Sequence, residues 1–420
     1  MYLGRRYESE SRVVVTGLGV VSPIGIGVKD FWQAALWGEV GTGEITQFDT
    51  GPFLTNKGGE VRDFEPARYV KNISYSELSR SAQFAVAVTR MAIEDAGLLD
   101  HCAGSDRMGV CFGAVVGNRP SCEPVARKLY EQRGRPVAEL TATSAHDVTV
   151  LSRFPAIELG LLGPNMTIPT ACAAGNSAIT YAMDTIRSGR ADVMIAAGAD
   201  ELSMTMFMMF NSFRALAPDR VQPFDKNRKG LILSEGAGAL AVESYRHAKD
   251  RGAVIYGEIL GHGNFADSHH MTAPHPEGLG ARRSIQAALN MAGVRPEQVD
   301  YISAHGTGTP TNDLVESKAI HAVFGQAAKS RPVSSIKSML GHTQGAASAI
   351  EAVSCLLAIR DNVIPPNVNY EEADRECDLN IIANAPIRRK VDVALNNAFG
   401  FGGNISCVVF SRLGTIGEAL

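Results

Sequence analysis

The hydrophobic pattern of the first half of the chain alternates between short apolar runs and longer segments of helical periodicity. Arg12–Gly17 is apolar and ends in a glycine, which is typical of a buried strand that enters a turn. Gly109–Gly113 and Ala191–Ala197 are similar short runs between polar or glycine residues. Ser79–Ala96 instead spaces its alanines, valines and phenylalanine as one face of an amphipathic helix. This alternation predicts an α/β architecture in which helices cover a buried sheet.

The second half of the chain repeats the same plan. It offers strand-like apolar runs at Val254–Gly261, Val299–Ala304 and Val391–Ala398, and helical patterns at Gly280–Ala292 and Gly345–Arg360. No sequence identity between the halves is evident. The prediction of an internal duplication therefore rests only on the repeated order of strands and helices.

The repeated order of strands and helices divides the chain into a leader, two halves and a tail. Residues 1–11 are polar and are expected to form a loose leader. The N-terminal half is expected to span residues 12–250 and the C-terminal half residues 251–413, followed by a tail over residues 414–420. The loop between Glu243 and Gly252 is expected to be the seam between the halves.

Composition narrows the class of protein. The chain has 420 residues, of which 45% are hydrophobic and 20% are charged, as expected for a globular protein with a large core. Its net charge of -4 provides no basic field that would favour nucleic acid or an anionic membrane as a partner. No apolar run is as long as a membrane span, and the first residues lack the apolar core of a signal peptide. We therefore expect a cytoplasmic protein with neither kind of partner.

The cysteines and most histidines indicate neither a disulfide framework nor a metal site. The cysteines contain no CxxC pair and no regular spacing, which favours a reducing compartment. Four clustered histidines fit no common metal-ligand pattern, so no metal is expected there. The thiols are Cys102, Cys111, Cys122, Cys172, Cys355, Cys377 and Cys407, and the clustered imidazoles are His262, His269, His270 and His275.

One cysteine has surroundings that a core thiol does not need. Cys172 lies in TACAAGNSA, Thr170–Ala178, between an extended segment and the helical pattern Ala173–Arg187. The free N–H groups and the dipole at such a helix start favour a thiolate, and small neighbours allow a substrate to approach. The backbone N–H of Cys172 is also placed to face a developing oxyanion. These features predict a nucleophile, with a buried core cysteine as the alternative.

Two glycine turns in the second half supply polar groups for such a nucleophile. His305 lies in AHGTGTPTND at the end of a predicted strand, and His342 lies in SIKSMLGHTQGAA before a long helix. A cysteine–histidine hydrolase needs one such base and an orienting Asp or Asn. Two imidazoles suit an enolate that forms by decarboxylation and attacks a thioester held on the cysteine. The accompanying polar residues are Thr307, Thr309, Lys337 and Glu351.

Seven motifs, taken in order, resemble those of one family. They are VVVTGLGVVSPIG, TACAAGNSAI, PFDKNRKGLILSEGAGAL, HHMTAPHPEG, AHGTGTPTND, KSMLGHTQGAA and NAFGFGG, and the resemblance extends from Arg12 to Leu413. On these motifs the chain resembles a β-ketoacyl-acyl carrier protein synthase of the elongating, type II kind, within the thiolase-like superfamily. The resemblance implies a duplicated, five-layered αβαβα fold, usually in a dimer, with the helix after the nucleophile buried at its centre.

The resemblance also implies a role for each motif residue. Cys172 is expected to carry the acyl group, and His305 and His342 to assist decarboxylation and hold the thioester carbonyl. Lys337 is the implied supporting cation, and Glu351 is its partner. The implied substrate contacts are Thr272, Thr307 and Thr309 at the phosphopantetheine arm, Phe401 as the gate of the acyl pocket, and Phe399, Gly400, Phe401 and Gly402 beside the oxyanion.

Other charged residues near these motifs have two interpretations each. Asp313 and Glu316 are either a catalytic acid pair or, as we expect, a structural tie between the His305 turn and its helix. Four basic residues are either a rim for an acidic carrier protein or parts of a solvated loop. These four are Arg220, Lys226, Arg228 and Lys229.

The implied reaction is a decarboxylative Claisen condensation. An acyl chain moves from its carrier protein to Cys172, malonyl-carrier protein loses carbon dioxide, and the product is a 3-oxoacyl-carrier protein longer by two carbons. No redox or metal cofactor is implied, because decarboxylation drives bond formation and the phosphopantetheine belongs to the carrier. The expected partners are the acyl carrier protein and either a second copy of the chain or a related ketosynthase-like subunit.

The sequence leaves three alternatives open. MTMFMMF, Met204–Phe210, is heavier than the glycine-rich segment common in fatty-acid enzymes, and indicates a reshaped acyl pocket or dimer interface, or ordinary core packing. It keeps open a specialised type II polyketide ketosynthase that works with a chain-length-factor-like partner. A non-condensing subunit of this fold would lack Cys172. A thiolase would need a second catalytic cysteine, and Cys407 lies in the apolar run ISCVVF, which is typical of a core strand.

Overall fold

A computed structural model describes residues 12–118 and 147–415, together with a few single residues between them. The expected leader, residues 416–420 of the expected tail, and Cys122 lie outside the described residues. Within the described ranges, no helix combines the length and the apolar character needed to cross a membrane. The single residues are Pro120, Glu123, Arg127, Lys128 and Glu131.

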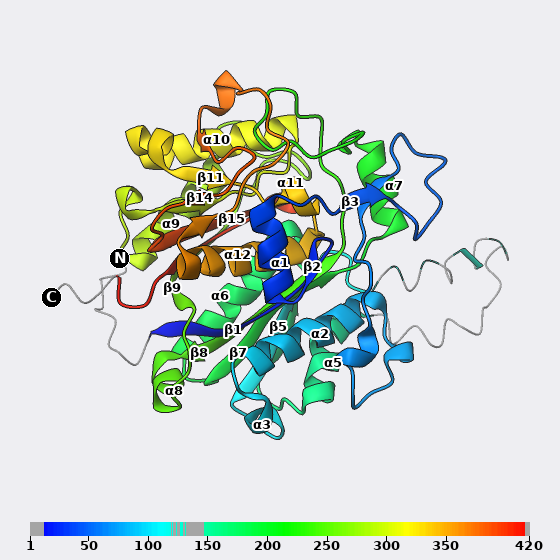
Figure 1. Ribbon diagram of the computed structural model, residues 1–420, viewed down its shortest axis with the longest axis vertical. Coiled ribbons are helices and arrows are strands. Elements are labelled where there is room, and N and C mark those ends of the chain that lie inside the picture. The colour runs from blue at the N-terminus through cyan, green and yellow to red at the C-terminus, as the bar shows by residue number, and fades with distance from the viewer. Residues whose placement is uncertain are drawn as a thin grey trace.

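Five strands of the N-terminal half form one side of the central sheet (Figure 1). In chain order they are β1 (Val13–Ser22), β5 (Met108–Gly113), β6 (Asn165–Ile168), β7 (Val193–Asp200) and β8 (Gly236–Ser244). Their order across the sheet is β6-β5-β7-β8-β1. β5 pairs in parallel with β6 and β7, whereas β8 pairs antiparallel with β7 and β1.

The C-terminal half repeats this order strand for strand. It reads β11-β10-β15-β16-β9, and β13 (Asn380–Ile381) extends the edge beyond β11. β10 pairs in parallel with β11 and β15, and β16 pairs antiparallel with β15 and β9. β1 and β9 pair antiparallel where the halves meet. This repeated strand order confirms the expected duplication. The strands of the C-terminal half are β9 (Gly257–Ala266), β10 (Tyr301–Ser303), β11 (Pro332–Ser334), β15 (Val393–Gly400) and β16 (Asn404–Ser411).

Helices cover both outer faces of the sheet and fill the space between its halves (Figure 1). α2 and α5 cover the N-terminal strands, α9 packs on β9 and β16, and α10 packs on α9. α6 and α12 lie at the centre, where α12 contacts both β8 and β15. This is the expected five-layered αβαβα arrangement. The helices are α2 (Arg80–Asp95), α5 (Val150–Leu159), α6 (Ala174–Arg187), α9 (Leu279–Ala292), α10 (Pro310–Phe324) and α12 (Ala347–Asp361).

Glycines on the first strand of each half let the outer helices lie close to the sheet. A Cβ on Gly17 of β1 would lie 2.1 Å from the carbonyl oxygen of Ala92 in α2. A Cβ on Gly263 of β9 would lie 2.2 Å from the carbonyl oxygen of Ser284 in α9. Both halves therefore seat their outer helix on the corresponding strand in the same way.

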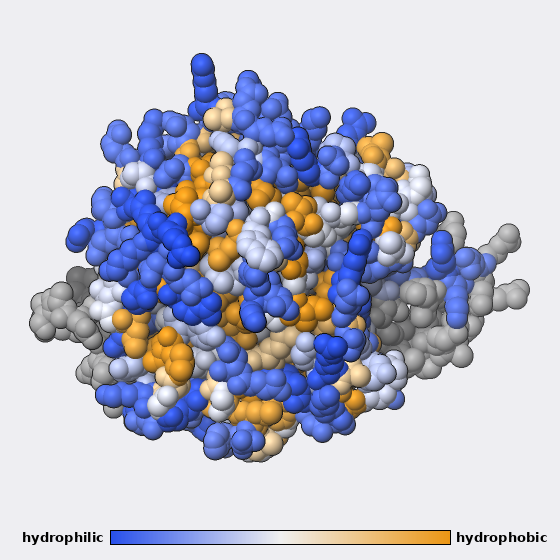
Figure 2. Space-filling model, in the orientation of Figure 1, coloured by the Kyte–Doolittle hydropathy of each residue, from blue (hydrophilic) through white to orange (hydrophobic). Residues whose placement is uncertain are grey.

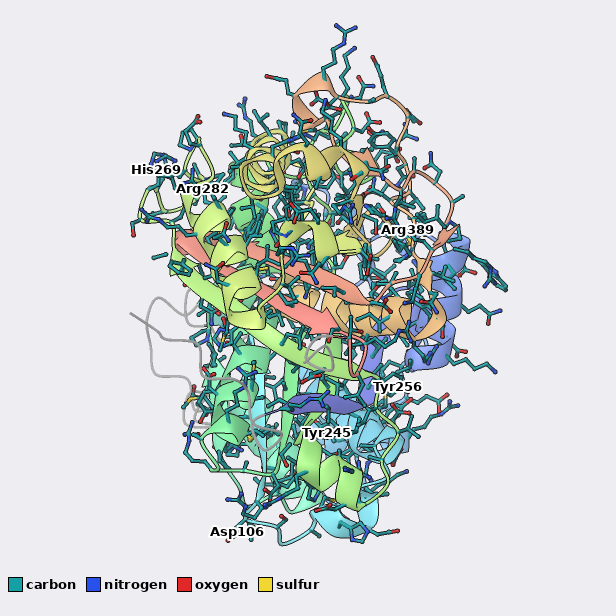
Figure 3. The ribbon with its side chains drawn as sticks, turned by 90° about the vertical axis from the view of Figure 1, so that its left-hand side faces the viewer. Asp106, Tyr245, Tyr256, His269, Arg282 and Arg389 are labelled. Atoms are coloured by element: carbon teal, nitrogen blue, oxygen red, sulfur yellow. The ribbon has the colours of Figure 1, made fainter. Side chains whose placement is uncertain are left out.

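The expectation of a loop between Glu243 and Gly252 is wrong. Most of this segment forms the helix α8 (Tyr245–Asp250), which is too short to leave a periodic pattern in the sequence. Beyond α8, the N–H of Tyr256 donates to the carbonyl oxygen of Val15 at 2.8 Å and ties the connection to β1. Figure 3 shows Tyr245 and Tyr256 on the same side of the molecule, at either end of this connection. The exact boundary between the halves stays a prediction.

The remaining elements are short and lie around this framework. The strand expected to begin at Val254 begins three residues later, with β9 at Gly257. On the face seen in Figure 2, hydrophilic residues surround smaller apolar areas. The other elements used below or labelled in the figures are α1 (Val28–Trp37), α3 (Leu99–Cys102), α7 (Met204–Ser212), α11 (Lys337–Leu340), β2 (Gly25–Ile26), β3 (Thr42–Glu44) and β14 (Ile387–Arg388).

Gly17→Ala is expected to lower the free energy of unfolding by about 1–3 kcal/mol, because the added methyl group meets backbone atoms of α2. Denaturant titration followed by circular dichroism measures the change. Gly43→Ala in β3 is the matched control, since a Cβ there meets only the end of the Arg62 side chain, at 3.6 Å. Equal unfolding midpoints for the two variants would contradict the close packing of α2 on β1.

Candidate active site

A cavity of about 430 Å³ is lined by residues from both halves of the chain. It collects one thiol, three imidazoles, several hydroxyl groups and a set of aromatic rings, and two of the imidazoles are those of His305 and His342. Segments far apart in the sequence therefore meet at one place, as expected for a site between duplicated halves. The lining residues discussed below are Cys172, Phe210, Phe213, Arg214, Lys229, Thr272, His305, Thr307, Thr309, His342, Phe399, Gly400 and Phe401.

Cys172 lies at the bend between β6 and the central helix α6. It occupies a single 3-10 turn, Ala171–Ala173, directly before α6 begins. Ala171 has a φ of 51°, which costs a non-glycine residue energy, so the turn that presents the thiol is strained. Gly400 leaves room for the turn, because a Cβ there would lie 3.0 Å from the backbone N of Cys172. The predicted position of Cys172 at the start of a helix is confirmed.

Two opposing influences act on the thiol of Cys172. Burial raises its pKa to about 11, and the positive charge of Lys337 acts in the opposite direction. The side chain still keeps a partly exposed surface toward the cavity. Since burial dominates, the group is a thiol at neutral pH, whereas the helix start alone predicts a thiolate. A nucleophilic role for Cys172 would therefore require the loss of this proton during the reaction.

Buried carboxylates hold the turn that carries His305 at the end of β10. Glu316 of α10 accepts hydrogen bonds from the N–H groups of His305 and Gly306, both at 2.8 Å. Asp313 accepts one from the N–H of Gly308 at 3.2 Å. Burial raises the pKa of Glu316 to about 7, against the effect of these N–H donors. Both acids lie behind the turn, where they tie it to α10.

Hydrogen bonds to Nδ1 set the tautomer of both imidazoles. The backbone N–H of Gln344 donates to Nδ1 of His342 at 3.1 Å. The ammonium group of Lys337 lies 3.4 Å from Nδ1 of His305 and acts as its donor. A neutral imidazole that accepts at Nδ1 carries its proton on Nε2. Each of the two histidines therefore has an Nε2–H donor.

Both imidazoles are neutral in this environment. Burial lowers the pKa of His305 and of His342 well below the usual value, and the charge of Lys337 adds to this effect. The two ring centroids lie 5.5 Å apart, and the rings are nearly perpendicular at 81°. Two neutral N–H donors at this spacing can stabilise one developing oxyanion.

A buried ion pair lies behind His305. Lys337 of α11 is 1% exposed and donates to the carbonyl oxygen of His305 at 2.7 Å and to the carboxylate of Glu351 on α12. Burial raises the pKa of Glu351 to about 7, and the charge of Lys337 opposes this shift. Neither side chain is among the described residues that line the cavity. The pair therefore contacts His305 from behind and does not form part of the described cavity wall.

The cavity brings together most of the expected substrate contacts. Thr307 and Thr309 line it with hydroxyl oxygens 2.9 Å apart, and Thr272 lines it from the loop after β9. Phe399, Gly400 and Phe401 form the wall next to the nucleophile. Of the expected contacts, Gly402 is not among the described lining residues.

The family motifs do not include three of the lining residues discussed here: Phe210, Phe213 and Arg214. Phe210 belongs to α7, which contains the heavy stretch MTMFMMF. The structure supports two of the interpretations of that stretch, because Phe207 is buried in a small core while Phe210 lines the cavity. Phe213 lies beyond the stretch and carries no signal of its own in the sequence.

Three of the four basic residues considered as a rim are already paired with acids. Arg220 pairs with Glu371, Lys226 with Glu372, and Arg228 with Asp374. These acids follow far later in the chain, so no local pattern reveals the pairs. Lys229 is the exception: it is exposed, lines the cavity, and has no ion-pair partner among the residues that the structure describes.

Of the four clustered histidines, His270 also lines the cavity, whereas the other three and the other described cysteines are not among its lining residues. Cys407 is fully buried on β16 within the core of the C-terminal half and does not reach the cavity. The rings of His269 and His275 lie 5.0 Å apart on the loop after β9, where Figure 3 shows His269 at the edge of the molecule. Within the described ranges, no three side chains of His, Cys, Asp or Glu are placed to hold a metal ion.

Comparison with known families agrees with this geometry. Residues 10–248 match the family model described as "Beta-ketoacyl synthase, N-terminal domain", and residues 256–371 match "Beta-ketoacyl synthase, C-terminal domain". The chain belongs to the β-ketoacyl synthase family.

Similar proteins share this fold over nearly their whole length. The chain is 42% identical over 409 residues to the 3-oxoacyl-[acyl-carrier-protein] synthase 2 of Coxiella burnetii, covering 96% of this chain and 99% of the relative. The solved ishigamide ketosynthase/chain length factor has a TM-score of 0.88 and 40% identity, with coverage of 96% and 99%. AntDE:AntF, a type II PKS acyl-carrier protein in complex with its ketosynthase bound to the hexaketide, has a TM-score of 0.88, 33% identity and the same coverage.

Alkylation of Cys172 by iodoacetamide is expected to accelerate about tenfold per pH unit between about pH 7 and 10 without a plateau. The reason is that burial raises the pKa of this thiol to about 11. Intact-mass spectrometry over time measures the rate, and Cys172→Ala reports alkylation of the other thiols.

The double variant Lys337→Met/Glu351→Met removes both buried charges at once and so leaves neither unpaired. Lys337 lowers the pKa of Cys172 more than Glu351 raises it. Removal of both charges is therefore expected to raise this pKa and to slow alkylation at each pH. A plateau near pH 9 in the wild type would contradict the dominance of burial.

Proposed function

We propose that this protein is a 3-oxoacyl-[acyl-carrier-protein] synthase, an acyltransferase that extends an acyl chain by two carbons. The observation that carries the proposal is one thiol and two imidazoles, each with an Nε2–H donor, in a single cavity. The relative from Coxiella burnetii, whose name describes this activity, supports it at 42% identity.

The first half-reaction transfers an acyl group from a carrier protein to Cys172. A bond forms between the sulfur of Cys172 and the acyl carbon, the bond to the pantetheine sulfur breaks, and the cysteine proton passes to that leaving thiol. The N terminus of α6 stabilises the negative charge that develops on the carbonyl oxygen. Because the pKa of Cys172 is raised, removal of its proton is part of this step.

The second half-reaction begins when a malonyl thioester binds against His305 and His342. The carboxylate leaves as carbon dioxide, and the electron pair of the broken C–C bond forms an enolate. The Nε2–H groups of both histidines donate to the enolate oxygen. The enolate carbon attacks the acyl group on Cys172, the new C–C bond forms, and the bond to the enzyme sulfur breaks. The released thiolate takes up a proton from solvent, which restores the thiol of Cys172. The product is a 3-oxoacyl group on the carrier, longer by two carbons.

The carrier protein brings the phosphopantetheine arm, so the proposed reaction requires no redox or metal cofactor. Thr272, Thr307 and Thr309 offer hydroxyl groups along the cavity for this arm. We place the enzyme in the cytoplasm, because its described cysteines are free thiols, as is usual in a reducing compartment.

A specialised polyketide ketosynthase is the second candidate. Two solved relatives are a ketosynthase/chain length factor and a type II PKS ketosynthase. Phe210 and Phe213, at the end of α7, form part of the cavity wall. Such an enzyme pairs with a related subunit, whereas a fatty-acid enzyme pairs with its own copy. β6 ends the described sheet and exposes Asn165 and Met166, which supports a partner of either kind at this edge.

Cys172→Ala is expected to abolish acyl transfer to the protein, because the thioester needs the sulfur atom. Wild type and variant are mixed with acyl-carrier proteins of several chain lengths and then with malonyl-carrier protein. Intact-mass analysis is expected to show acylated wild type, followed by carbon dioxide release and a product longer by two carbons. If no carrier acylates the wild type, even with a partner subunit supplied, the proposed function is refuted.

Cys407→Ala is the matched control for this experiment, since Cys407 is buried on β16 away from the cavity. The variant is expected to accept and condense acyl groups as the wild type does. Loss of condensation in a correctly folded Cys407→Ala protein would favour a thiolase-type mechanism with a second catalytic cysteine.

Lys229→Ala is expected to raise the KM for acyl-carrier protein about threefold to tenfold with little change in kcat, because an exposed cation at the cavity attracts an acidic carrier. Lys226→Ala is the control, since Lys226 already pairs with Glu372. Added salt is expected to reduce the difference between wild type and Lys229→Ala. Equal KM values for the two variants at low salt would contradict a docking role for Lys229.

A further inference from the structure

Three phenylalanine rings form one wall of the cavity, and no step of the proposed reaction uses them. Phe210 and Phe401 stack with ring centroids 5.4 Å apart and an interplanar angle of 21°. Phe213 meets Phe401 edge-on at 6.3 Å and Phe210 at 6.5 Å. All three rings line the cavity that contains Cys172. We call Phe210, Phe213 and Phe401 the aromatic triad.

The backbone of Phe401 is held in place beside the nucleophile. Gly400, its neighbour, lies against Cys172, where a Cβ would be 3.0 Å from the backbone N. The side-chain amide of Asn404 donates to the carbonyl oxygen of Phe401 at 3.0 Å, and the N–H of Gly402 donates to the loop after β9 at 2.7 Å. With the backbone tied on both sides, the direction of the Phe401 ring depends on the rings that contact it.

The other two rings of the triad stand on a fixed support. Phe207 of α7 is fully buried and packs edge-on against Phe48 at 5.6 Å and Phe53 at 5.2 Å. This contact anchors α7, and Phe210 and Phe213 project from its far end toward Phe401. Phe213 itself is 47% exposed, so the core does not depend on its ring.

We infer that Phe213 is a positioning residue that, with Phe210, holds Phe401 beside Cys172 and thereby sets the length of acyl chain that the enzyme accepts. A chain long enough to pass Phe401 must displace its ring and break its contacts with both other phenylalanines. A short chain ends before this point and leaves the triad intact. This inference rests on the proposed function, because it concerns the acyl group that Cys172 receives.

Phe213→Ala removes the edge contact to Phe401 and tests this inference directly. The variant is expected to raise the rate of acylation by long chains relative to short chains about threefold to tenfold, the value of one aromatic contact. Saturated acyl-carrier proteins of increasing length are the probes, and intact-mass spectrometry gives the initial rate of Cys172 acylation for each. Phe213→Tyr keeps the ring and is expected to retain the ratio of the wild type.

Met208→Ala is the matched control, because Met208 lies on α7, is 48% exposed and is not among the described lining residues. It is expected to leave the ratio of long-chain to short-chain rates unchanged. An unchanged ratio in Phe213→Ala, the same change in Met208→Ala, or a tyrosine variant that behaves like the alanine variant would overturn the inference. A wild type that no carrier acylates would instead overturn the proposed function, so the two failures are distinguishable.

Discussion

The site depends on one close contact between the N termini of the two central helices, α6 and α12. Gly175 permits this contact, because a Cβ there would lie 2.5 Å from the backbone N of Ala349 and 2.8 Å from Oγ of Ser348. Any larger residue would force the two helix starts apart, since a packed interior has no room to absorb it. Cys172 precedes α6 and His342 precedes α12, so the same contact places the thiol beside the imidazole.

Buried amides make this contact specific. The N–H of Asn176 donates to Oγ of Ser348 at 2.9 Å, and the side chain of Asn396 donates to Oδ1 of Asn176 and to the carbonyl oxygen of Ser348, both at 2.9 Å. All three residues are fully buried, where an unmatched partner would cost about 1–3 kcal/mol. Asn396 belongs to β15, which ends at the cavity wall with Phe399 and Gly400. One network therefore sets the register of three elements that carry the site.

Strong periodicity and clear ends made several elements predictable from the sequence. Ser79–Ala96 predicts a helix, and α2 follows it with Ser79 as the N-cap. The strongly apolar segment Gly345–Arg360 becomes the central helix α12, which is buried nearly all round because protein surrounds it. The short helix α8 was missed, since six residues show no period. The residue types of the site were also predictable, and Cys172 meets both histidines in one cavity. The protonation states of Cys172 and the two histidines were not predictable, because they depend on how deeply the folded protein buries these groups.

In the proposed reaction, the position of Lys337 explains how the site would favour loss of carbon dioxide. Burial lowers the pKa of both imidazoles, and the charge of Lys337 adds to this effect. Donation from Lys337 to Nδ1 of His305 leaves the Nε2 proton free to donate. Glu351 balances the buried charge, so the lysine needs no solvent. An imidazolium in the cavity would bind the malonyl carboxylate and stabilise the ground state, which opposes its departure. A neutral N–H donor gains most when the thioester oxygen becomes an oxyanion. A cation behind His305, and not beside the substrate, therefore directs its effect to the transition state.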